Sequence, residues 1–303
     1  MAEAEAATRS GFVALLGAPN AGKSTLLNRM VGAKVSIVTP KAQTTRARIT
    51  GIAMEGAAQI VFVDTPGIFA PKRRLDRAMV AAAWQGAKDA DLVVLLVDAA
   101  RRNIDRDTAA IIEGLKESGH RTVLALNKVD LVRRDTLLAK AQALNERLPF
   151  TATFMISAAT GDGVDDLKRW LAEAMPPGPF LFDPEQISDL PVRLLAAEIT
   201  REKLFLNLHD ELPYALTVEN EAWEEFKDGS VKISQTIYVE RESQRAIALG
   251  KGGQRIRKVR ELAAAEIAEM LERPVHLFLF VKVRADWGED PQRYTPWGLD
   301  PKA

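Results

Sequence analysis

The chain has 303 residues, enough for two ordinary domains, and its 47% hydrophobic and 27% charged content excludes an intrinsically disordered protein. Basic and acidic residues both number 41, so any nucleic-acid-binding surface must be a local basic patch. Cysteine is absent, which excludes disulfides and thiolate metal sites. We expect no signal peptide and no transmembrane helix, since the apolar runs are too short.

The first motif follows an apolar run at 12–16 that has the length of a buried strand. The next residues fit the pattern G-x-x-x-x-G-K-[ST], in which backbone N–H groups and a helix N-terminus bind phosphate. Its proposed phosphate-binding residues are Gly17, Asn20, Ala21, Gly22, Lys23, Ser24 and Thr25. Lys23 is expected to reach the β- and γ-phosphates, and Ser24 to bind Mg²⁺. The alternative is a glycine-containing turn that binds nothing.

A polar segment follows the first predicted helix. Residues 33–48 contain strand-forming side chains, but Pro40 and the polar run at 41–46 interrupt them. A threonine hydroxyl here can close over a γ-phosphate and bind Mg²⁺. Thr45 is the first choice and Thr44 the second, and a solvated loop is the alternative.

The next predicted strand, 59–64, ends in Asp64 and is followed by Thr65-Pro66-Gly67. Asp64 is expected to hold Mg²⁺, directly or through water. Gly67 has no side chain, so its N–H can approach the γ-phosphate closely. The pattern Asp-x-x-Gly is weak alone, and it gains weight from its position after the phosphate loop and the threonine segment.

A strand at 91–98, a helix at 108–117 and a strand at 122–126 precede a motif for the base. The Asp130 carboxylate can accept hydrogen bonds from N1–H and the 2-amino group of guanine, an edge that adenine lacks. Asn127 is expected to brace the neighbouring loops, and Lys128 to lie along the base. A helix cap after a strand is the alternative.

A last strand at 153–156 leads to Ser157, Ala158 and Ala159, whose backbone N–H groups are expected to face guanine O6. A helix at 163–174 closes this part of the chain. Alternating strands and helices predict an α/β domain with a mostly parallel sheet, and such sheets bind ligands at the carboxyl ends of their strands.

The proline-rich stretch at 176–179 marks a break, after which the predicted order is α-β-β-α-α-β. The elements are expected at 191–206, 214–219, 231–239, 243–249, 254–272 and 275–283. Residues 277–280, Leu-Phe-Leu-Phe, are expected to lie in the core rather than to stack on bases.

A GxxG turn and a basic run lie between the last two helices. The candidate RNA-binding residues are Gly250, Lys251, Gly252, Gly253, Arg255, Arg257 and Lys258. No acidic residue occurs from 243 to 260. Backbone N–H groups and positive charge at such a turn suit the phosphates of single-stranded nucleic acid, as in KH modules. The alternatives are a structural turn and a solvated basic helix face.

Taken together, the motifs resemble those of the Era family of ribosome-associated GTPases over nearly the whole chain. GAPNAGKST at 17–25, KAQTTRARI at 41–49, DTPG at 64–67, NKVD at 127–130 and SAA at 157–159 follow that family's order, and GKGGQRIRKV at 250–259 is similar to its KH signature. The resemblance implies a GTPase domain at 1–178, a linker at 179–188 and an α+β type II KH domain with a C-terminal tail at 189–303.

The resemblance also implies a function. It predicts Mg²⁺-dependent GTP hydrolysis, binding of 16S ribosomal RNA near its 3′ end, and a role in assembly and maturation of the 30S subunit. GTP is expected to favour RNA binding and hydrolysis to release the RNA. A cytoplasmic monomer with peripheral contact to the inner membrane is expected.

Hydrolysis is expected to be slow. GTPases of the Ras type orient the attacking water with a glutamine directly after Asp-x-x-Gly. Ile68 occupies that position here and cannot hydrogen-bond a water. Arg46 and Arg48 are the candidate arginine fingers. The resemblance also implies a role for Asn20, since similar GTPases with this asparagine in the phosphate loop can use it to hold K⁺, which would restore charge compensation.

Two other functions stay open on the sequence. One is a GTPase of another kind, such as one acting in tRNA modification or metabolism, whose second half binds a protein. The other is an RNA-binding scaffold that holds nucleotide with little or no catalysis.

Overall fold

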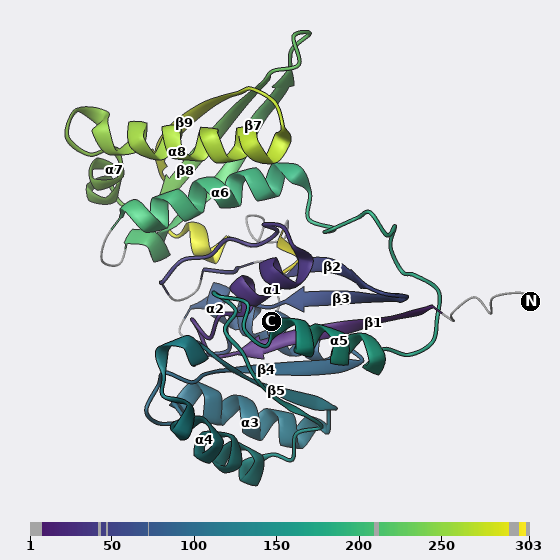
Figure 1. Ribbon diagram of the computed structural model, residues 1–303. Helices are drawn as coiled ribbons and strands as arrows, with labels where there is room; N and C mark the ends of the chain where they lie inside the picture. Colours follow the sequence, from purple (N-terminus) through teal and green to yellow (C-terminus); the bar gives the residue numbers. More distant parts are fainter. Residues whose placement is uncertain are drawn as a thin grey trace, which may run out of the picture. The chain divides into compact units, whose positions relative to one another are not determined.

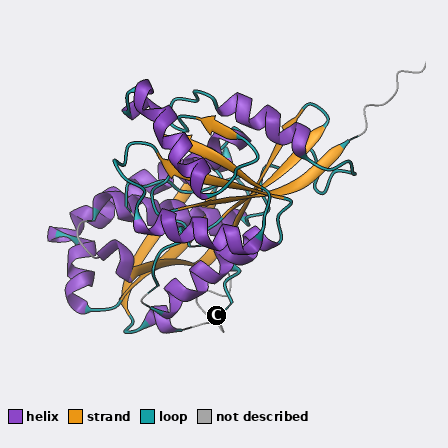
Figure 2. Ribbon diagram, turned by 90° about the horizontal axis from the view of Figure 1, so that it is seen from below, coloured by secondary structure: helices purple, strands orange, loops and turns teal. Residues whose placement is uncertain are grey.

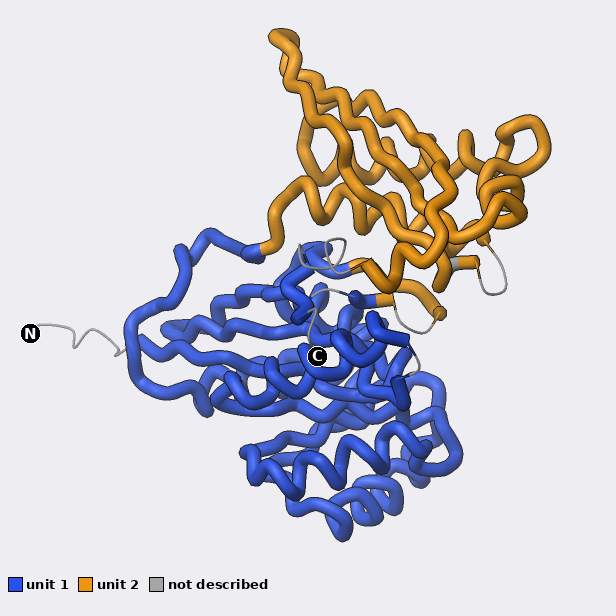
Figure 3. The backbone as a smooth tube through the Cα atoms, turned by 180° about the vertical axis from the view of Figure 1, so that it is seen from behind, with its two compact units in different colours: residues 1–36, 45–189, 295–303 blue, residues 37–44, 190–294 orange. Residues whose placement is uncertain are grey.

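The computed structural model describes residues 8–41, 44–46, 48–71, 73–208, 212–290 and 297–300. The backbone forms two compact units (Figure 3). Unit 1 comprises residues 1–36, 45–189 and 295–303, and unit 2 comprises residues 37–44 and 190–294. The chain therefore enters unit 2 briefly at 37–44, within the segment predicted to carry the metal-binding threonine.

Unit 1 is built on a six-stranded sheet with the order β2-β3-β1-β4-β5-β6. The strands are β1 (Arg9–Gly17), β2 (Ile49–Glu55), β3 (Ala58–Asp64), β4 (Leu92–Asp98), β5 (Thr122–Asn127) and β6 (Thr153–Met155). All neighbours pair in parallel except β2 and β3, which are antiparallel. The predicted mostly parallel sheet is confirmed, and nearly every residue of β3, β4 and β5 is buried because helices cover both faces.

Helices flank this sheet (Figures 1 and 2). They are α1 (Lys23–Val31), α2 (Arg74–Lys88), α3 (Arg106–Ser118), α4 (Arg134–Arg147) and α5 (Val164–Ala174). Side chains of α2, α3 and α4 share one apolar cluster with β1, β4 and β5. Helices α1 and α5 contact each other and the β2–β3 side of the sheet.

Three elements of unit 1 were not predicted. Strand β2 follows directly on the polar threonine segment, which hid its start. Helix α2 begins at Arg74, inside a basic stretch that reads as a loop. Helix α4 buries only Leu137 and Leu144, so its sequence carries little helical periodicity.

Unit 2 has the predicted order of elements. They are α6 (Val192–Asn207), β7 (Leu216–Glu225), β8 (Val231–Val239), α7 (Glu242–Leu249), α8 (Gln254–Leu271) and β9 (Val275–Val283). The sheet order is β7-β8-β9, with β7 and β8 antiparallel and β8 and β9 parallel. Helices α6 and α8 bury their apolar side chains against this sheet.

The prediction that residues 277–280 are all core is wrong. Leu277 is buried, but Phe278 and Phe280 are 46% and 52% exposed. Successive side chains of a strand point to opposite faces, and the helices of this unit pack on the face that Leu277 occupies.

The aromatic residues near the C-terminus divide between the units. Trp287 is buried in unit 2, where its indole N–H donates to the carbonyl of Ala215 at 3.0 Å. Trp297 is buried in unit 1, with the guanidinium carbon of Arg46 5.9 Å from its ring centroid. Tyr294 lies outside the described residues. No helix in the described ranges is long and apolar enough to cross a bilayer.

Candidate functional site

The phosphate-loop motif joins β1 to α1, and its glycines are required by space. A Cβ on Gly17 would lie 2.6 Å from the carbonyl oxygen of Leu96. Gly22 has φ +101°, and a Cβ there would lie 2.2 Å from the side-chain nitrogen of Asn127. Side chains at these positions would therefore separate the loop from β4 and from the base motif. Helix α1 begins at Lys23, so its first N–H groups open onto this loop.

Lys23 is buried beneath the loop. Its amine donates to the carbonyls of Gly17 at 3.1 Å and Ala18 at 3.3 Å. Burial lowers the pKa of Lys23 to about 8, and the nearby charge of Asp64 opposes this shift. A negatively charged phosphate beside this buried amine would stabilise its protonated form.

The three predicted metal ligands, Ser24, Thr45 and Asp64, meet at the end of β3. The Ser24 hydroxyl donates to an Asp64 carboxylate oxygen at 2.6 Å and lies 2.8 Å from the Thr45 hydroxyl. Ser36, which was not predicted, donates to the same carboxylate oxygen at 3.1 Å. Burial raises the pKa of Asp64, against the charge of Lys23 and the hydrogen bonds from the hydroxyls.

The chemistry of this cluster fits Mg²⁺. Asp64 is fully buried, and its other oxygen, Oδ1, has no hydrogen-bond partner among the described residues. One carboxylate with hydroxyl oxygens matches the way Mg²⁺ is held alongside substrate phosphates. In the described ranges, no group of three or more His, Cys, Asp or Glu side chains could hold a metal.

The two candidate threonines lie in different surroundings. The Thr44 hydroxyl lies 2.6 Å from the Thr39 hydroxyl and donates to the Lys41 carbonyl at 2.8 Å. The Thr45 hydroxyl contacts Ser24 instead. Only Thr45 of the two therefore faces the predicted metal ligands.

The Asp-x-x-Gly segment lies against the phosphate loop. A Cβ on Gly67 would approach three atoms of Pro19 at 3.1 Å. The Ile68 N–H donates to the Gly17 carbonyl at 3.3 Å, and the Ile68 side chain belongs to the apolar core. The residue after the glycine is thus turned away from any attacking water.

Asn127 links two loops of the site. Its amide group donates to the Ala21 carbonyl at 2.8 Å and accepts from the Ala158 N–H at 2.9 Å. The Ser157 N–H donates to the Asp162 carbonyl at 2.9 Å. An O6 contact from Ser157 or Ala158 would therefore share an N–H that already has an acceptor, and Ala159 is the remaining candidate.

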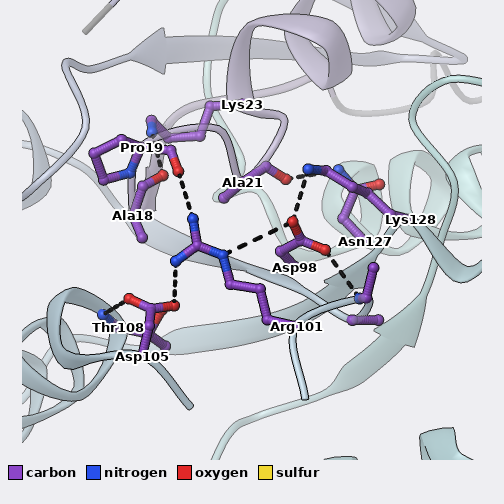
Figure 4. Close-up of polar contacts among 12 residues, drawn as sticks. Ala18, Pro19, Ala21, Lys23, Asp98, Arg101, Asp105, Thr108, Asn127 and Lys128 are labelled. Carbon is purple, nitrogen blue, oxygen red and sulfur yellow. Dashed lines mark hydrogen bonds and ion pairs between the residues drawn. The ribbon is translucent and has the colours of Figure 1, made fainter. Parts of the chain in front are cut away.

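The rest of the base motif is positioned by residues that the sequence did not single out. The Lys128 amine pairs with Asp98, at the end of β4, at 2.7 Å (Figure 4). Arg29 of α1 donates to the carbonyls of Ala158 and Ala159. Asp130 lies in a single 3₁₀ turn, Val129–Leu131, and is exposed, which leaves its carboxylate open to a base. Parallel-strand order could have indicated Asp98, because β4 lies beside β5.

The two candidate arginine fingers have partners within unit 1. Arg46 is buried under Trp297, and Arg48 forms an ion pair with Asp89 at 3.5 Å. Neither contact involves the phosphate loop.

The GxxG turn of unit 2 is an exposed 3₁₀ turn, Lys251–Gly253, between α7 and α8. Gly252 and Gly253 have φ +59° and +75°, and a Cβ on either would meet no described atom within 4 Å. Arg255 donates to the Ile247 carbonyl and so fastens the turn to α7. The glycines leave open space where another molecule's backbone can approach.

The basic side chains around this turn differ in their pairing. Arg245 pairs with Glu242 at 2.7 Å, and Arg260 lies 3.8 Å from Glu261. The side chains of Lys251, Arg257 and Lys258 are exposed, and no acidic group of the described chain pairs with them. Their charge remains available to phosphates.

These features define a P-loop GTPase joined to a KH domain, and comparisons with known families agree. Residues 12–128 match the family model described as a 50S ribosome-binding GTPase, and residues 211–288 match the KH domain model.

Full-length relatives give the particular family. The chain is 65% identical to GTPase Era of Rhizobium meliloti (strain 1021) over 97% of this chain and 93% of the relative. It is 62% identical to GTPase Era of Bradyrhizobium diazoefficiens over 98% and 96%. The chain belongs to the GTPase Era family, and the fold class predicted from the resemblance is confirmed.

Two solved structures share the fold at 36% identity, each covering 96% of this chain and 99% of the other. One is Era in complex with MgGDPNP and nucleotides 1506–1542 of 16S ribosomal RNA, with a TM-score of 0.92. The other is a variant of Aquifex aeolicus Era bound to GDP·AlF4⁻, with a TM-score of 0.91.

Proposed function

We propose that this GTPase uses its phosphate loop, with Gly17, Asn20, Ala21, Gly22, Lys23, Ser24 and Thr25, to bind GTP. Ser24, Thr45 and Asp64 would hold Mg²⁺, which supplies charge neutralisation between the β- and γ-phosphates. The observation that carries the proposal is that the Ser24 hydroxyl contacts both the Thr45 hydroxyl and the buried Asp64 carboxylate, whose Oδ1 has no hydrogen-bond partner among the described residues. Lys23 would neutralise the phosphates, and Gly67 would present its N–H to the γ-phosphate.

Guanine selection is assigned to Asp130, with Lys128 along the base and Asn127 as the brace between loops. The Lys128–Asp98 ion pair and the two Asn127 hydrogen bonds support these roles. The loop of Ser157, Ala158 and Ala159 would lie against O6. Calorimetric titration with GDP and ADP tests the assignment: binding of GDP alone is expected, and equal affinities would contradict it.

We further propose slow intrinsic hydrolysis assisted by K⁺ at Asn20. The core position of Ile68 supports the first part, since no side chain there can orient a water. The positive φ of Asn20, +64°, is unusual for a non-glycine residue and supports a special role for it. Turnover measured in K⁺ should exceed turnover in Na⁺, and Asn20→Ala should remove the difference. Equal rates for the wild type in both salts would contradict the K⁺ role.

For unit 2 we propose binding of 16S ribosomal RNA near its 3′ end by Gly250, Lys251, Gly252, Gly253, Arg255, Arg257 and Lys258, with a role in 30S assembly and maturation. The open, positively charged turn supports an RNA backbone there, and so does the RNA present in the related Era complex. Crosslinking to cellular RNA tests this. Sites concentrated at the 3′ end of 16S RNA are expected, and sites concentrated on tRNA would favour the tRNA-modification alternative.

Nucleotide state is proposed to gate this RNA binding through residues 37–44. These residues belong to unit 2, where the Val38 N–H donates to Glu202 at 2.9 Å and Arg201 donates to the Thr44 carbonyl. Arg201 is fully buried and pairs with Glu198. Thr45, the proposed metal ligand, is the next residue along the chain. A change in Thr45 on hydrolysis would therefore act directly on a segment that α6 holds.

The proposed domain limits stay at 1–178, 179–188 and 189–303. The two matched family models lie within the first and third ranges. We also propose a cytoplasmic monomer with peripheral contact to the inner membrane. Fractionation of cells, followed by salt extraction of the membrane pellet, would test that location, and protein that resists salt extraction would contradict it.

A further inference from the structure

Arg101 lies outside every predicted motif, in the loop between β4 and α3, and its guanidinium contacts three elements of unit 1 (Figure 4). Nη1 lies 2.9 Å from an Asp105 carboxylate oxygen, and Nε lies 4.0 Å from Asp98. Nη2 donates to the Pro19 carbonyl in the phosphate loop at 3.4 Å. The side chain is still 39% exposed, so packing alone does not account for its position.

Both carboxylates around Arg101 are themselves held in place. Asp105 caps α3 by accepting from the Thr108 backbone N–H at 2.9 Å and from its hydroxyl at 2.8 Å. Asp98 accepts from the Ala100 N–H at 2.9 Å and pairs with Lys128. The guanidinium therefore lies beside the phosphate loop between two carboxylates that other hydrogen bonds and an ion pair hold in place.

The contact with Pro19 fixes the orientation of one peptide group. In a trans peptide the carbonyl and the following N–H point in opposite directions, and no described peptide bond is cis. Because the Pro19 carbonyl points toward Arg101, the Asn20 N–H points away from it. In Figure 4 the Lys23 amine reaches the Ala18 carbonyl, whereas the Arg101 guanidinium reaches the Pro19 carbonyl.

This orientation needs support, because Asn20 has a left-handed φ of +64° that an asparagine adopts only at a cost. We propose that Arg101 is a positioning residue for the phosphate loop, which holds the Pro19–Asn20 peptide so that the Asn20 N–H is presented to a nucleotide phosphate. The charge of Arg101 also polarises this peptide and strengthens the N–H as a donor. The inference rests on the proposed nucleotide site.

The test compares Arg101→Gln with the neighbouring Arg102→Gln, whose side chain is exposed. Affinities for GDP and for inosine diphosphate, which lacks the 2-amino group, are measured by calorimetry. Loss of one charge-supported hydrogen bond should weaken both nucleotides about tenfold in Arg101→Gln. Their ratio should stay unchanged, because the contacts to the base are intact. Arg102→Gln should match the wild type.

A readout at Asn20 separates positioning from general loosening of the fold. The ¹⁵N and ¹H shifts of the Asn20 amide on GDP binding should be reduced in Arg101→Gln, while those of amides in the 157–159 loop should not change. If Arg101→Gln does not fold, Asp105→Asn serves instead. Asparagine still caps a helix but removes the charge that holds Arg101, so a smaller loss of the same kind is expected.

Lys23→Ala distinguishes failure of this inference from failure of the nucleotide site. If Lys23→Ala abolishes binding while Arg101→Gln binds like the wild type, the positioning role is wrong. If Lys23→Ala also binds like the wild type, the nucleotide site itself is wrong. A changed ratio of GDP to inosine diphosphate affinity in Arg101→Gln would also overturn the proposal, because it would place the effect at the base.

Discussion

Two glycine-rich loops of this molecule need glycine for different reasons. In the phosphate loop, a Cβ on Gly17 or Gly22 would collide with atoms of the protein itself. In the GxxG turn, Gly252 and Gly253 need only a left-handed backbone, and the space beside them is open among the described residues. The first loop is shaped by its own domain, whereas no described atom limits the space beside the glycines of the second.

The largest expected effect is a loss of GTP affinity on substitution of Asp130 in the base motif. It tests the assignment of unit 1, to which the phosphate loop belongs, as a GTP-binding unit. Asp130→Asn removes a carboxylate that accepts two hydrogen bonds, each about 1.5–3 kcal/mol for a charged group, so GTP affinity should fall about 100-fold or more. Xanthosine triphosphate, whose 2-oxo group can accept from an asparagine amide, should bind better than GTP. Asp135→Asn, in an exposed ion pair with Arg133, is the matched control and should bind GTP normally. Unchanged GTP preference in Asp130→Asn would refute guanine selection by this residue.

Negative charge placed in the GxxG turn is expected to lower RNA affinity without unfolding the domain. Gly252→Asp with Gly253→Asp places two negative charges where RNA phosphates would lie, and RNA affinity should fall on the order of 10- to 100-fold. GTP binding should not change. Gly229→Asp is the control, because Gly229 also has a positive φ, +83°, with open space beside it. RNA affinity equal to that of the wild type in the double variant would make the turn merely structural.

The free energy of unfolding of alanine variants compares the two glycine-rich loops directly. Gly22→Ala should cost about 3 kcal/mol, since it combines a strained backbone with loss of the buried Asn127–Ala21 hydrogen bond. Gly252→Ala should cost only the backbone strain, about 1 kcal/mol. Scanning calorimetry of the two variants gives both values. Equal destabilisation would mean that the collision at Gly22 is relieved by a small movement.

The smallest expected effect concerns the cap of α3 in unit 1. Burial tends to raise the pKa of Asp105, but hydrogen bonds from Thr108 and the charge of Arg101 outweigh it and lower that pKa. The carboxylate therefore stabilises the fold above its unfolded pKa of about 3.9, and this contribution is lost as the pH falls through the lower folded value. Asp105→Ala should cost about 1 kcal/mol at pH 7, with a smaller difference below pH 4. A difference that grows on acidification would contradict this sign.

The sequence was most informative where chemistry demands particular residues at particular spacing. The contents of the phosphate loop, the strand ending in Asp64 and the order of elements in unit 2 all followed from pattern. Contacts between distant segments did not, because no local rule brings Ser36 to Asp64. The pairing of Asp98 with Lys128 could be indicated only by the order of the strands, in which β4 lies beside β5. The exposure of Phe278 and Phe280 in β9 does not follow from the sequence either, since both resemble core residues until the covered face of the sheet is known.

Nucleotide-gated RNA binding, as proposed, would couple the phosphate loop to the GxxG turn, and RNA affinity in the two nucleotide states tests this coupling. A fluorescent RNA carrying the 3′ end of 16S ribosomal RNA would be titrated with the protein in the presence of GDPNP or GDP. We predict tighter binding with GDPNP, and loss of that difference in the double variant Glu198→Gln with Arg201→Met, which releases the Thr44 carbonyl. Equal RNA affinities of the wild-type protein in the two states would contradict nucleotide-gated RNA binding.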